Sequence, residues 1–155
     1  MENTKTLAGF NAVSGKLGRA YAKINGNNEE LFFAKSVEVT AEKTKGTVKA
    51  IGKITVGHKT TGLEITGSMT LYYYTPIFRQ MLAEYKKTGV DLYFDMVLEN
   101  DDPGSDAGKQ VMLLKDCNMD SVVLAKLDGD SDDALEEDVD FTAEDWSPLQ
   151  DFNKN

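Results

Sequence analysis

The sequence lacks the residue types that most catalytic and metal sites require. Cys117 is its only cysteine and His58 its only histidine. One thiol cannot form an internal disulfide, and these two residues alone cannot build a zinc site. A Cys117–His58 nucleophile pair is formally possible, but a lone cysteine in the mostly apolar stretch VMLLKDCNM is more typical of a small buried hydrophobe.

Long apolar runs are also missing. No apolar stretch approaches the ~20 residues that a membrane-spanning helix needs. The start, MENTKTLAGFNAVSGKLG, has neither the basic beginning nor the apolar stretch of a signal peptide, which predicts a protein made and kept in the cytoplasm. Hydrophobic residues make up 41% and charged residues 28% of the 155 positions. This balance predicts a single globular domain over residues 1–155.

Positive charge is scarce in one part of the chain. Asp128 to Asp145 holds ten carboxylates and no lysine or arginine, whereas the remaining 16 acidic residues are balanced by 17 basic ones. The net charge of −9 therefore resides almost entirely in an acidic C-terminal segment at 128–146. This distribution argues against nucleic-acid binding through a basic face.

Most of the sequence alternates between apolar and polar residues, which is typical of half-buried antiparallel strands. Three segments show the pattern clearly: SVEVTAE at 36–42, LEITGSMTLYYY at 63–74 and DLYFDMVLE at 91–99. Asn25-Gly26 and DDPGSDAG at 101–108 are turn signals between strands. A further strand is predicted from about Lys109 into VVLAKL, with a bend at Asp120 and Ser121.

One amphipathic helix is predicted at about 76–88. Thr75 is a suitable N-cap, Pro76 suits the first helical position, and Gly89 is a typical C-terminal stop. Its predicted apolar face consists of Ile77, Phe78, Met81, Leu82 and Tyr85. With about seven or eight strands and this one helix, the sequence predicts a mainly β fold, an antiparallel sandwich or barrel with a flanking helix.

The stretch GKITVGHKTTG resembles a phosphate-binding P-loop. Gly52, Gly57, Lys59 and Thr60 match that motif, but His58 separates the second glycine from the lysine. A P-loop needs a helix directly after it, whereas the residues that follow here alternate as a strand. The sequence therefore excludes the nucleotide-binding geometry.

The acidic segment resembles a calcium-binding EF-hand loop only in part. Asp128, Asp130 and Asp132 match the first three ligand positions, but Asp133 replaces the turn glycine and Val139 replaces the final glutamate. No specific calcium site follows from this match. No other catalytic set emerges, so the sequence predicts neither an enzyme nor a cofactor.

From Leu135 the acidic segment alternates again. One face carries Leu135, Val139, Phe141 and Ala143, and the other carries Glu136, Asp138, Asp140 and Glu144, with Glu137 as an exception on the apolar side. Such a strand is either a solvated edge that discourages aggregation or an acidic surface that faces a partner or a pore. The residues leave these alternatives open.

Four motifs occur in a fixed order: VSGKLGRAYAKING, GHKTTG, TPIFRQMLAEYKKTG and LDGDSDDALEEDVDFTAEDW. In this order the chain resembles the tail tube proteins of contractile phage tails, especially those of PBSX-like defective prophages and the tube subunits of diffocin-type bacteriocins. The resemblance covers nearly the whole length and is strongest over residues 52–89 and 128–146.

The resemblance implies a structural protein that assembles with itself. Tube subunits of this kind form hexameric rings that stack into a hollow tube on a baseplate initiator, inside a sheath. A long loop between early strands usually contacts the neighbouring ring, and here it corresponds to about residues 44–62. Its central residues are Gly57, His58, Lys59, Thr60 and Thr61. The acidic strand is then expected to line the lumen or to face the sheath.

Two other hypotheses remain at this point. The first is a related ring-forming module, such as a type VI secretion tube subunit or a tail terminator, which need not stack indefinitely. The second is a small nucleotide- or cation-binding enzyme, which only the incomplete P-loop and the acidic segment suggest.

Overall fold

The structure is a computed structural model that describes residues 8–11, 18–24, 27–30, 34–73, 76–130 and 132–152. The chain divides into two compact units. Unit 1 comprises residues 1–32, 93–116 and 146–155, and unit 2 comprises residues 33–92 and 117–145. Neither unit is a continuous piece of sequence, and the assignment of residues 1–155 to one domain stays a prediction.

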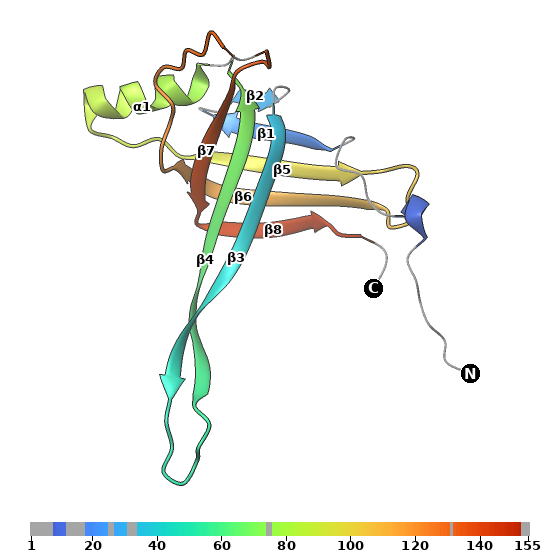
Figure 1. Ribbon diagram of the computed structural model, residues 1–155, viewed down its shortest axis with the longest axis vertical. Coiled ribbons are helices and arrows are strands. Elements are labelled where there is room, and N and C mark those ends of the chain that lie inside the picture. The colour runs from blue at the N-terminus through green and yellow to red at the C-terminus, as the bar shows by residue number, and fades with distance from the viewer. Residues whose placement is uncertain are drawn as a thin grey trace. The chain divides into compact units, whose positions relative to one another are not determined.

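Unit 1 is built around a small sheet (Figure 1). Its strands are β1 (Arg19–Ile24), β2 (Asn27–Glu30), β5 (Phe94–Asp101), most of β6 (Lys109–Met119) and β8 (Asp145–Gln150). The order is β2-β1-β5-β6, β8 also pairs with β6, and β1 runs antiparallel to both β2 and β5. Ala22, Ile24, Phe94, Met96 and Leu114 are buried, as alternation predicts for strands with one covered face.

Unit 2 is built around three strands, of which the first two are the longest among the described residues. They are β3 (Ala34–Val48), β4 (Gly57–Tyr72) and β7 (Glu136–Ala143), in the order β3-β4-β7. Both β4 pairings are antiparallel, and the last residues of β6 pair with β7 through Asn118↔Thr142 and Met119↔Phe141. In neither unit do the described pairings close a barrel.

The predicted alternation in β4 is confirmed only where the strand has neighbours on both sides. Ile65, Met69 and Leu71 are at most 7% exposed, but Leu63, in the same alternation, is 57% exposed. This change in exposure occurs where β4 gains its second neighbour, because β7 pairs with β4 only from Ile65↔Ala143 onward. Before that row the chain is a two-stranded ribbon, which cannot cover its own apolar face.

Among the described residues a short 3-10 helix spans Gly9–Asn11, and one α-helix, α1, spans Ile77–Thr88. Gly89 closes it in the left-handed conformation (φ 74°) and donates its N–H to the Tyr85 carbonyl at 2.8 Å, as predicted. Pro76 occupies the N-cap position, and the predicted cap, Thr75, lies outside the described residues. Phe78 and Met81 are buried, whereas Leu82 and Tyr85 are more than a third exposed, so the buried face is narrower than predicted.

The predicted strand at VVLAKL is wrong. β6 ends at Met119, a bend follows at Asp120, and residues 121–128 have no strand pairing. The Asp120 N–H donates to the Asp140 carbonyl at 2.7 Å, in register with the last β6–β7 pairs, and the chain leaves β7 after this bond. An apolar alternation forms a strand only where its backbone pairs with a neighbour, and the pattern alone does not decide that.

The mainly β fold class with one helix is confirmed. The predicted break at 101–108 separates β5 from β6, whereas Asn25-Gly26 lies outside the described residues. Among the residues that are described, no helix has the length and apolarity needed to cross a membrane.

Gly67 is packed against an aromatic ring in the middle of the unit 2 sheet. It lies directly opposite Phe141 in the β4–β7 register, and Phe141 is only 1% exposed. A Cβ atom on Gly67 would come within 2.4 Å of the Phe141 ring. The ring therefore occupies the space that any larger residue at position 67 would need.

We expect Gly67→Ala to lower the free energy of unfolding by about 1–3 kcal/mol, because a buried ring has little room to move. Gly62→Ala is the matched control, since it lies on the same strand with nothing within 4 Å of its added Cβ. Urea unfolding of dilute, unassembled subunits measures both. Equal midpoints for the two variants would contradict this packing.

Candidate assembly surfaces

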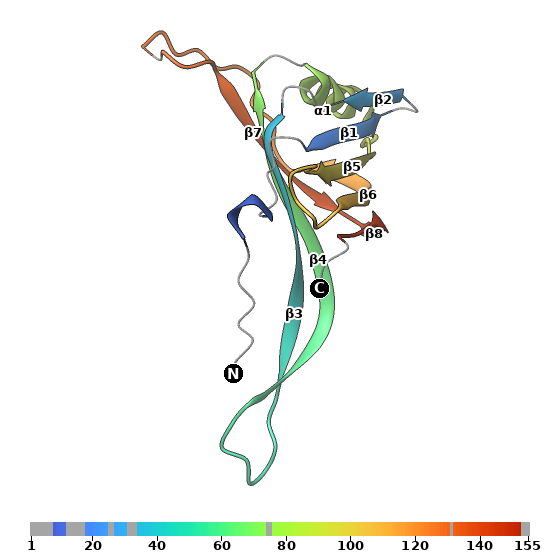
Figure 2. The ribbon, with the colours of Figure 1, turned by 90° about the vertical axis from the view of Figure 1, so that its right-hand side faces the viewer.

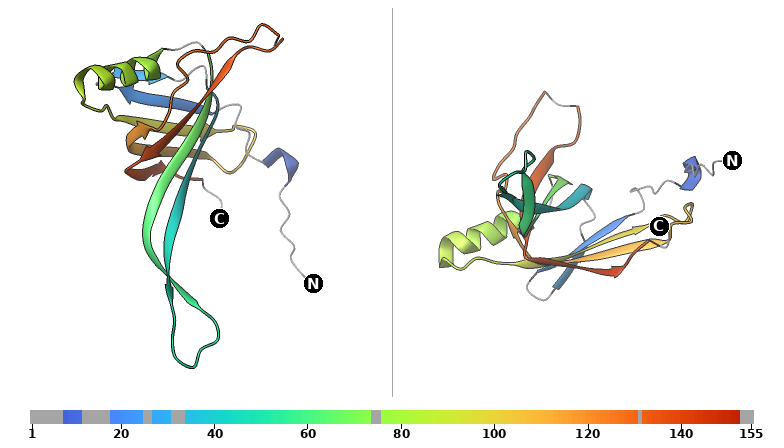
Figure 3. Two further views of the ribbon diagram at one scale, coloured as in Figure 1. Left: turned by 60° about the vertical axis from the view of Figure 1, so that its left-hand side comes forward. Right: turned by 90° about the horizontal axis from the view of Figure 1, so that it is seen from below.

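Beyond the three-stranded part of unit 2, β3 and β4 continue alone as a long β-hairpin. We call residues 43–63 the arm. Its strands stay paired up to Val48↔Gly57, with a register shift between Thr44 and Lys45. At that shift Thr61 Oγ1 donates to the Thr44 carbonyl at 3.1 Å. The arm extends far past the end of β7 in three views (Figure 1, Figure 2 and the left panel of Figure 3).

The predicted assembly loop is mostly strand rather than loop. Gly57, His58, Lys59 and Thr60 are the first residues of β4 and pair with Val48, Thr47, Gly46 and Lys45. Thr61 also lies within β4, and the turn itself comprises residues 49–56. The resemblance implies a loop here, but the threonines and valines of this stretch favour extended backbone. A role of these residues in assembly stays a prediction.

The tip of the arm exposes large apolar side chains, which sequence reasoning missed. Ile51 and Ile54 are fully exposed, and Val48 and Val56 are about half exposed. Burying one such side chain contributes roughly 1.5–3 kcal/mol, so leaving several in water is costly. The signal in the sequence was two isoleucines beside Gly52, whose φ of 81° makes it a turn residue.

The arm is also strongly basic. Residues 43–63 contain five lysines and the only histidine, and no carboxylate. Within the described part of the chain, no ion pair involves these lysines. A basic, apolar-tipped ribbon without internal partners has the character of a docking element.

The geometry excludes the two catalytic alternatives at this location. His58 is exposed on the arm, whereas Cys117 is completely buried at the end of β6, so they do not form a nucleophile pair. Lys59 and Thr60 lie within a strand, and no helix N-terminus follows to bind a phosphate. Among the described residues, no three His, Cys, Asp or Glu side chains gather as a metal site.

β7 presents the predicted acidic face. Glu136, Asp138 and Asp140 alternate with buried Glu137, Val139 and Phe141, while Glu144 is an exposed residue in the bend after the strand. Asp140, Ser68 and Glu38 lie in one row across β7, β4 and β3. These three residues line an open depression of about 420 Å³. Because all three side chains are polar and two are carboxylates, the face is polar and acidic across three strands.

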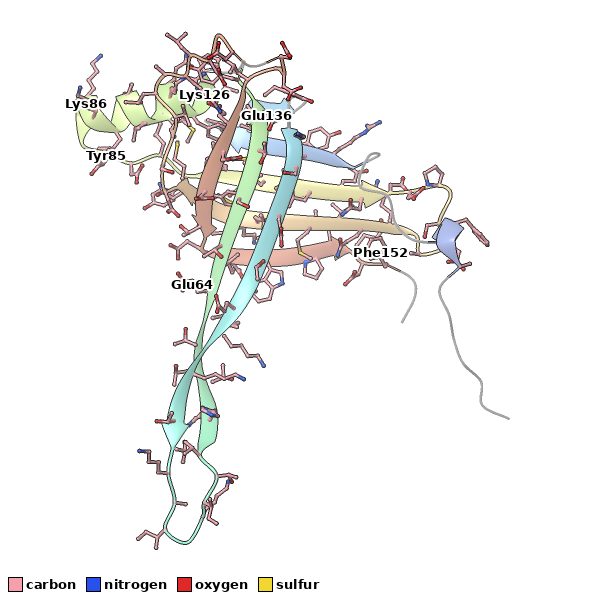
Figure 4. All side chains as sticks on the ribbon, viewed as in Figure 1. Glu64, Tyr85, Lys86, Lys126, Glu136 and Phe152 are labelled. Carbon is pink, nitrogen blue, oxygen red and sulfur yellow. The ribbon has the colours of Figure 1, made fainter. Side chains whose placement is uncertain are left out.

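Two of the predicted acidic residues have side-chain partners on the other strands of the unit 2 sheet. Lys35 Nζ lies 2.8 Å from Glu136 Oε1, and this hydrogen bond, with the attraction of the two charges, raises the pKa of Lys35. Thr70 Oγ1 donates to Asp138 Oδ1 at 2.8 Å. Lys126 Nζ also donates to the Glu136 main-chain carbonyl at 2.8 Å, and both residues are marked in Figure 4.

Glu137, the exception in the alternation, is a buried charge. Its side chain is fully buried, and Oε2 accepts a hydrogen bond from Arg79 on α1 at 2.5 Å. Arg79 also donates to the Val123 carbonyl at 3.3 Å and lies 4.8 Å from the centre of the Tyr73 ring. One arginine thereby connects α1 with β7 and with residues 121–128. No local pattern indicates this pairing, because the two residues are 58 positions apart.

Comparison with known proteins identifies the family of this chain. Residues 5–150 match the family described as "Phage tail tube protein". The chain is 41% identical over 140 residues to the "Phage-like element PBSX protein XkdM" of Bacillus subtilis (strain 168), which covers 90% of this chain and 92% of the relative. This chain belongs to the phage tail tube protein family.

Solved structures with the same fold come from tail-like particles. A chain of the anti-feeding prophage baseplate gives a TM-score of 0.63 at 11% identity, covering 96% of this chain and 97% of that one. A chain of the PVC sheath/tube terminator, from an extracellular contractile injection system, gives 0.64 at 10% identity, covering 85% and 94%. At such identities the likeness shows the fold alone.

Family membership decides several sequence predictions. The protein is a structural subunit of a tail tube and not an enzyme, and its place is in the phage tail particle. The resemblance to PBSX-type tube proteins is confirmed. The arm and the acidic face are therefore surfaces of a protein that assembles with copies of itself.

We expect Arg79→Met to lower the free energy of unfolding by about 3 kcal/mol or more, because it leaves the Glu137 carboxylate buried without its cation. The double variant Arg79→Met/Glu137→Leu should recover most of this loss, since both charges are then removed. Lys35→Met, which breaks an exposed pair, is the control and should leave the urea midpoint unchanged. Similar losses for the single and double variants would contradict the pairing.

Proposed function

We propose that this tail tube protein forms the inner tube of a contractile tail, as hexameric rings that stack inside a sheath on a baseplate initiator. Subunits fold in the cytoplasm of the producing bacterium and leave it only as part of the particle. The family match and the PBSX relative support a tube. The fold shared with a baseplate chain and a sheath/tube terminator chain of contractile particles supports the contractile setting.

The arm is the main observation in support of this proposal, because its exposed apolar tip is unfavourable in an isolated subunit. A two-stranded ribbon with fully exposed isoleucines at its tip has little stability of its own and gains burial only against another molecule. The arm, including Gly57, His58, Lys59, Thr60 and Thr61, would supply the contact between successive rings.

The acidic face would line the lumen of the tube. Its side chains are carboxylates and hydroxyls spread over three strands, which suits a wetted wall better than a packed interface. A negative wall repels a polyanion such as DNA and lets it pass without adhering. Glu136, Asp138, Asp140 and Glu144 would contribute to this wall.

A tail terminator is the second candidate, and the fold shared with the PVC sheath/tube terminator chain favours it. A terminator closes a tube and does not continue to stack. Electron microscopy of the purified protein at high concentration separates the two, because a tube protein gives growing tubes and a terminator gives single rings.

Shortening the arm tests its role in stacking. We expect replacement of residues 45–61 by Asn-Gly to give folded subunits or rings that form no tubes. Thr44 and Gly62 are paired across the arm, and Asn-Gly is a favoured two-residue hairpin turn. Unchanged urea unfolding would establish that the variant is folded, and negative-stain microscopy would score tubes. Normal tubes from the shortened protein would refute the role of the arm.

Charge reversal tests the orientation of the acidic face. We expect Asp138→Lys/Asp140→Lys to leave co-assembly with the sheath protein intact, because lumen residues do not contact the sheath. The reversed lumen should also retain DNA that the wild-type tube does not retain. Co-sedimentation of tube and sheath, and of tube and DNA, measures both effects. Loss of sheath binding with normal tubes would place the acidic face on the outside.

A further inference from the structure

The two ends of unit 2 differ in charge. The arm turn, with Lys49 and Lys53, lies at the start of β4. The far end of β4 carries the acidic segment, because Tyr72 pairs with Glu136 and the Tyr73 N–H donates to the Leu135 carbonyl at 2.8 Å. Since β4 has 16 residues and strands rise ~3.3 Å per residue, roughly 50 Å separate the basic end from the acidic one. Figures 1 and 2 show both ends of this unit.

Like the arm tip, the far end of unit 2 exposes apolar surface, and its charge is opposite to that of the tip. Leu127 is 97% exposed and directly precedes Asp128, Asp130 and Asp132, which are exposed too. Lys126 holds this segment to the start of β7 through its bond to the Glu136 carbonyl. We call residues 127–130 with Asp132 the acidic end. Exposed leucine beside carboxylates is the complement of exposed isoleucine beside lysines.

We propose that the arm tip of one copy docks onto the acidic end of a second copy, with Ile51 and Ile54 packing toward Leu127 and Lys49 and Lys53 pairing with Asp128, Asp130 and Asp132. This inference rests on the proposed stacking role of the arm and names the surface that receives it. Without the arm, the chain carries a net charge of −14 against +5 on the arm. A second copy is therefore an electrostatic partner for the arm.

The geometry makes this contact open-ended. The tip cannot reach the acidic end of its own chain, because the paired strands hold the two apart along the whole of β4. A contact between two different surfaces of identical subunits is a head-to-tail contact. If each copy is shifted relative to the previous one in the direction of the arm, the contact repeats without limit. Docking tip to end would thus extend a tube by one ring at a time.

A nucleic acid is the other polyanion that a basic arm could bind. The observations favour the second copy, because phosphates do not cover isoleucine side chains, and both isoleucines are fully exposed. Five lysines on the arm still make DNA binding a defined outcome of the test.

Charge exchange tests the contact on the full chain. Lys49→Glu/Lys53→Glu reverses the tip, and Asp130→Lys/Asp132→Lys reverses the acidic end. Each variant alone should raise the critical concentration for tube growth by roughly tenfold or more, since like charges would then meet at every junction. The combined variant should regain tubes, and so should a mixture of the two reversed proteins. Sedimentation and negative-stain microscopy measure tube growth.

Lys86→Glu/Lys87→Glu is the matched control. These two lysines lie in the last turn of α1, where Figure 4 shows Lys86 directed outward, and their reversal makes the same change in net charge. This control should form tubes at the wild-type concentration. Urea unfolding confirms that every variant is folded, so a loss of tubes reports on docking and not on stability.

The outcomes separate this inference from the proposed function. If the shortened arm abolishes tubes but the combined charge exchange does not restore them, the arm stacks rings through another surface and the inference fails alone. If the shortened arm leaves tubes normal, the proposed function of the arm fails as well. Binding of a short DNA duplex that the tip reversal abolishes, with unchanged tube growth, would assign the arm to nucleic acid and overturn the inference.

Discussion

The unequal pairing of β4 is the constraint on which the rest of unit 2 depends. β3 accompanies β4 along nearly its whole length, but β7 joins it only from Ile65 onward. A strand with neighbours on both sides can bury one face, and a two-stranded ribbon cannot. The same strand therefore belongs to a buried core at one end and to an exposed arm at the other. A feature suited to assembly thus extends directly from a folded body, without a flexible linker.

The position of β7 also decides where the charge lies. Its pairing places Glu136 beside the last residue of β4, so the acidic segment begins at the end opposite the arm turn. Along β7, alternation directs Asp138 and Asp140 outward and Glu137 inward. The inward carboxylate is tolerated because Arg79 reaches it from α1 and supplies the opposite charge.

Local patterns predicted much of the fold. The alternation of β3, β4, β5 and β7, the turn at 101–108 and the Gly89 helix stop all depend on residues close in sequence, and the structure has them. The prediction of a strand at VVLAKL was wrong because a strand needs a paired neighbour, and alternation does not encode whether the chain stays beside one. The resemblance to tail tube proteins implies a loop at about residues 44–62, but the structure pairs Gly57 to Thr60 with Lys45 to Val48 as strands.

Short-range patterns and ordered motifs in the sequence are enough to predict the mainly β character, one helix, the absence of a P-loop and the family. The three-dimensional pairing is needed to show that Gly57 to Thr61 belong to a strand, that Ile51 and Ile54 have no cover within the described chain, and that Glu137 meets Arg79. These facts depend on which strand lies beside which. Such pairings join residues far apart in sequence, and their free energy comes from burial that exists only once the sheet has formed.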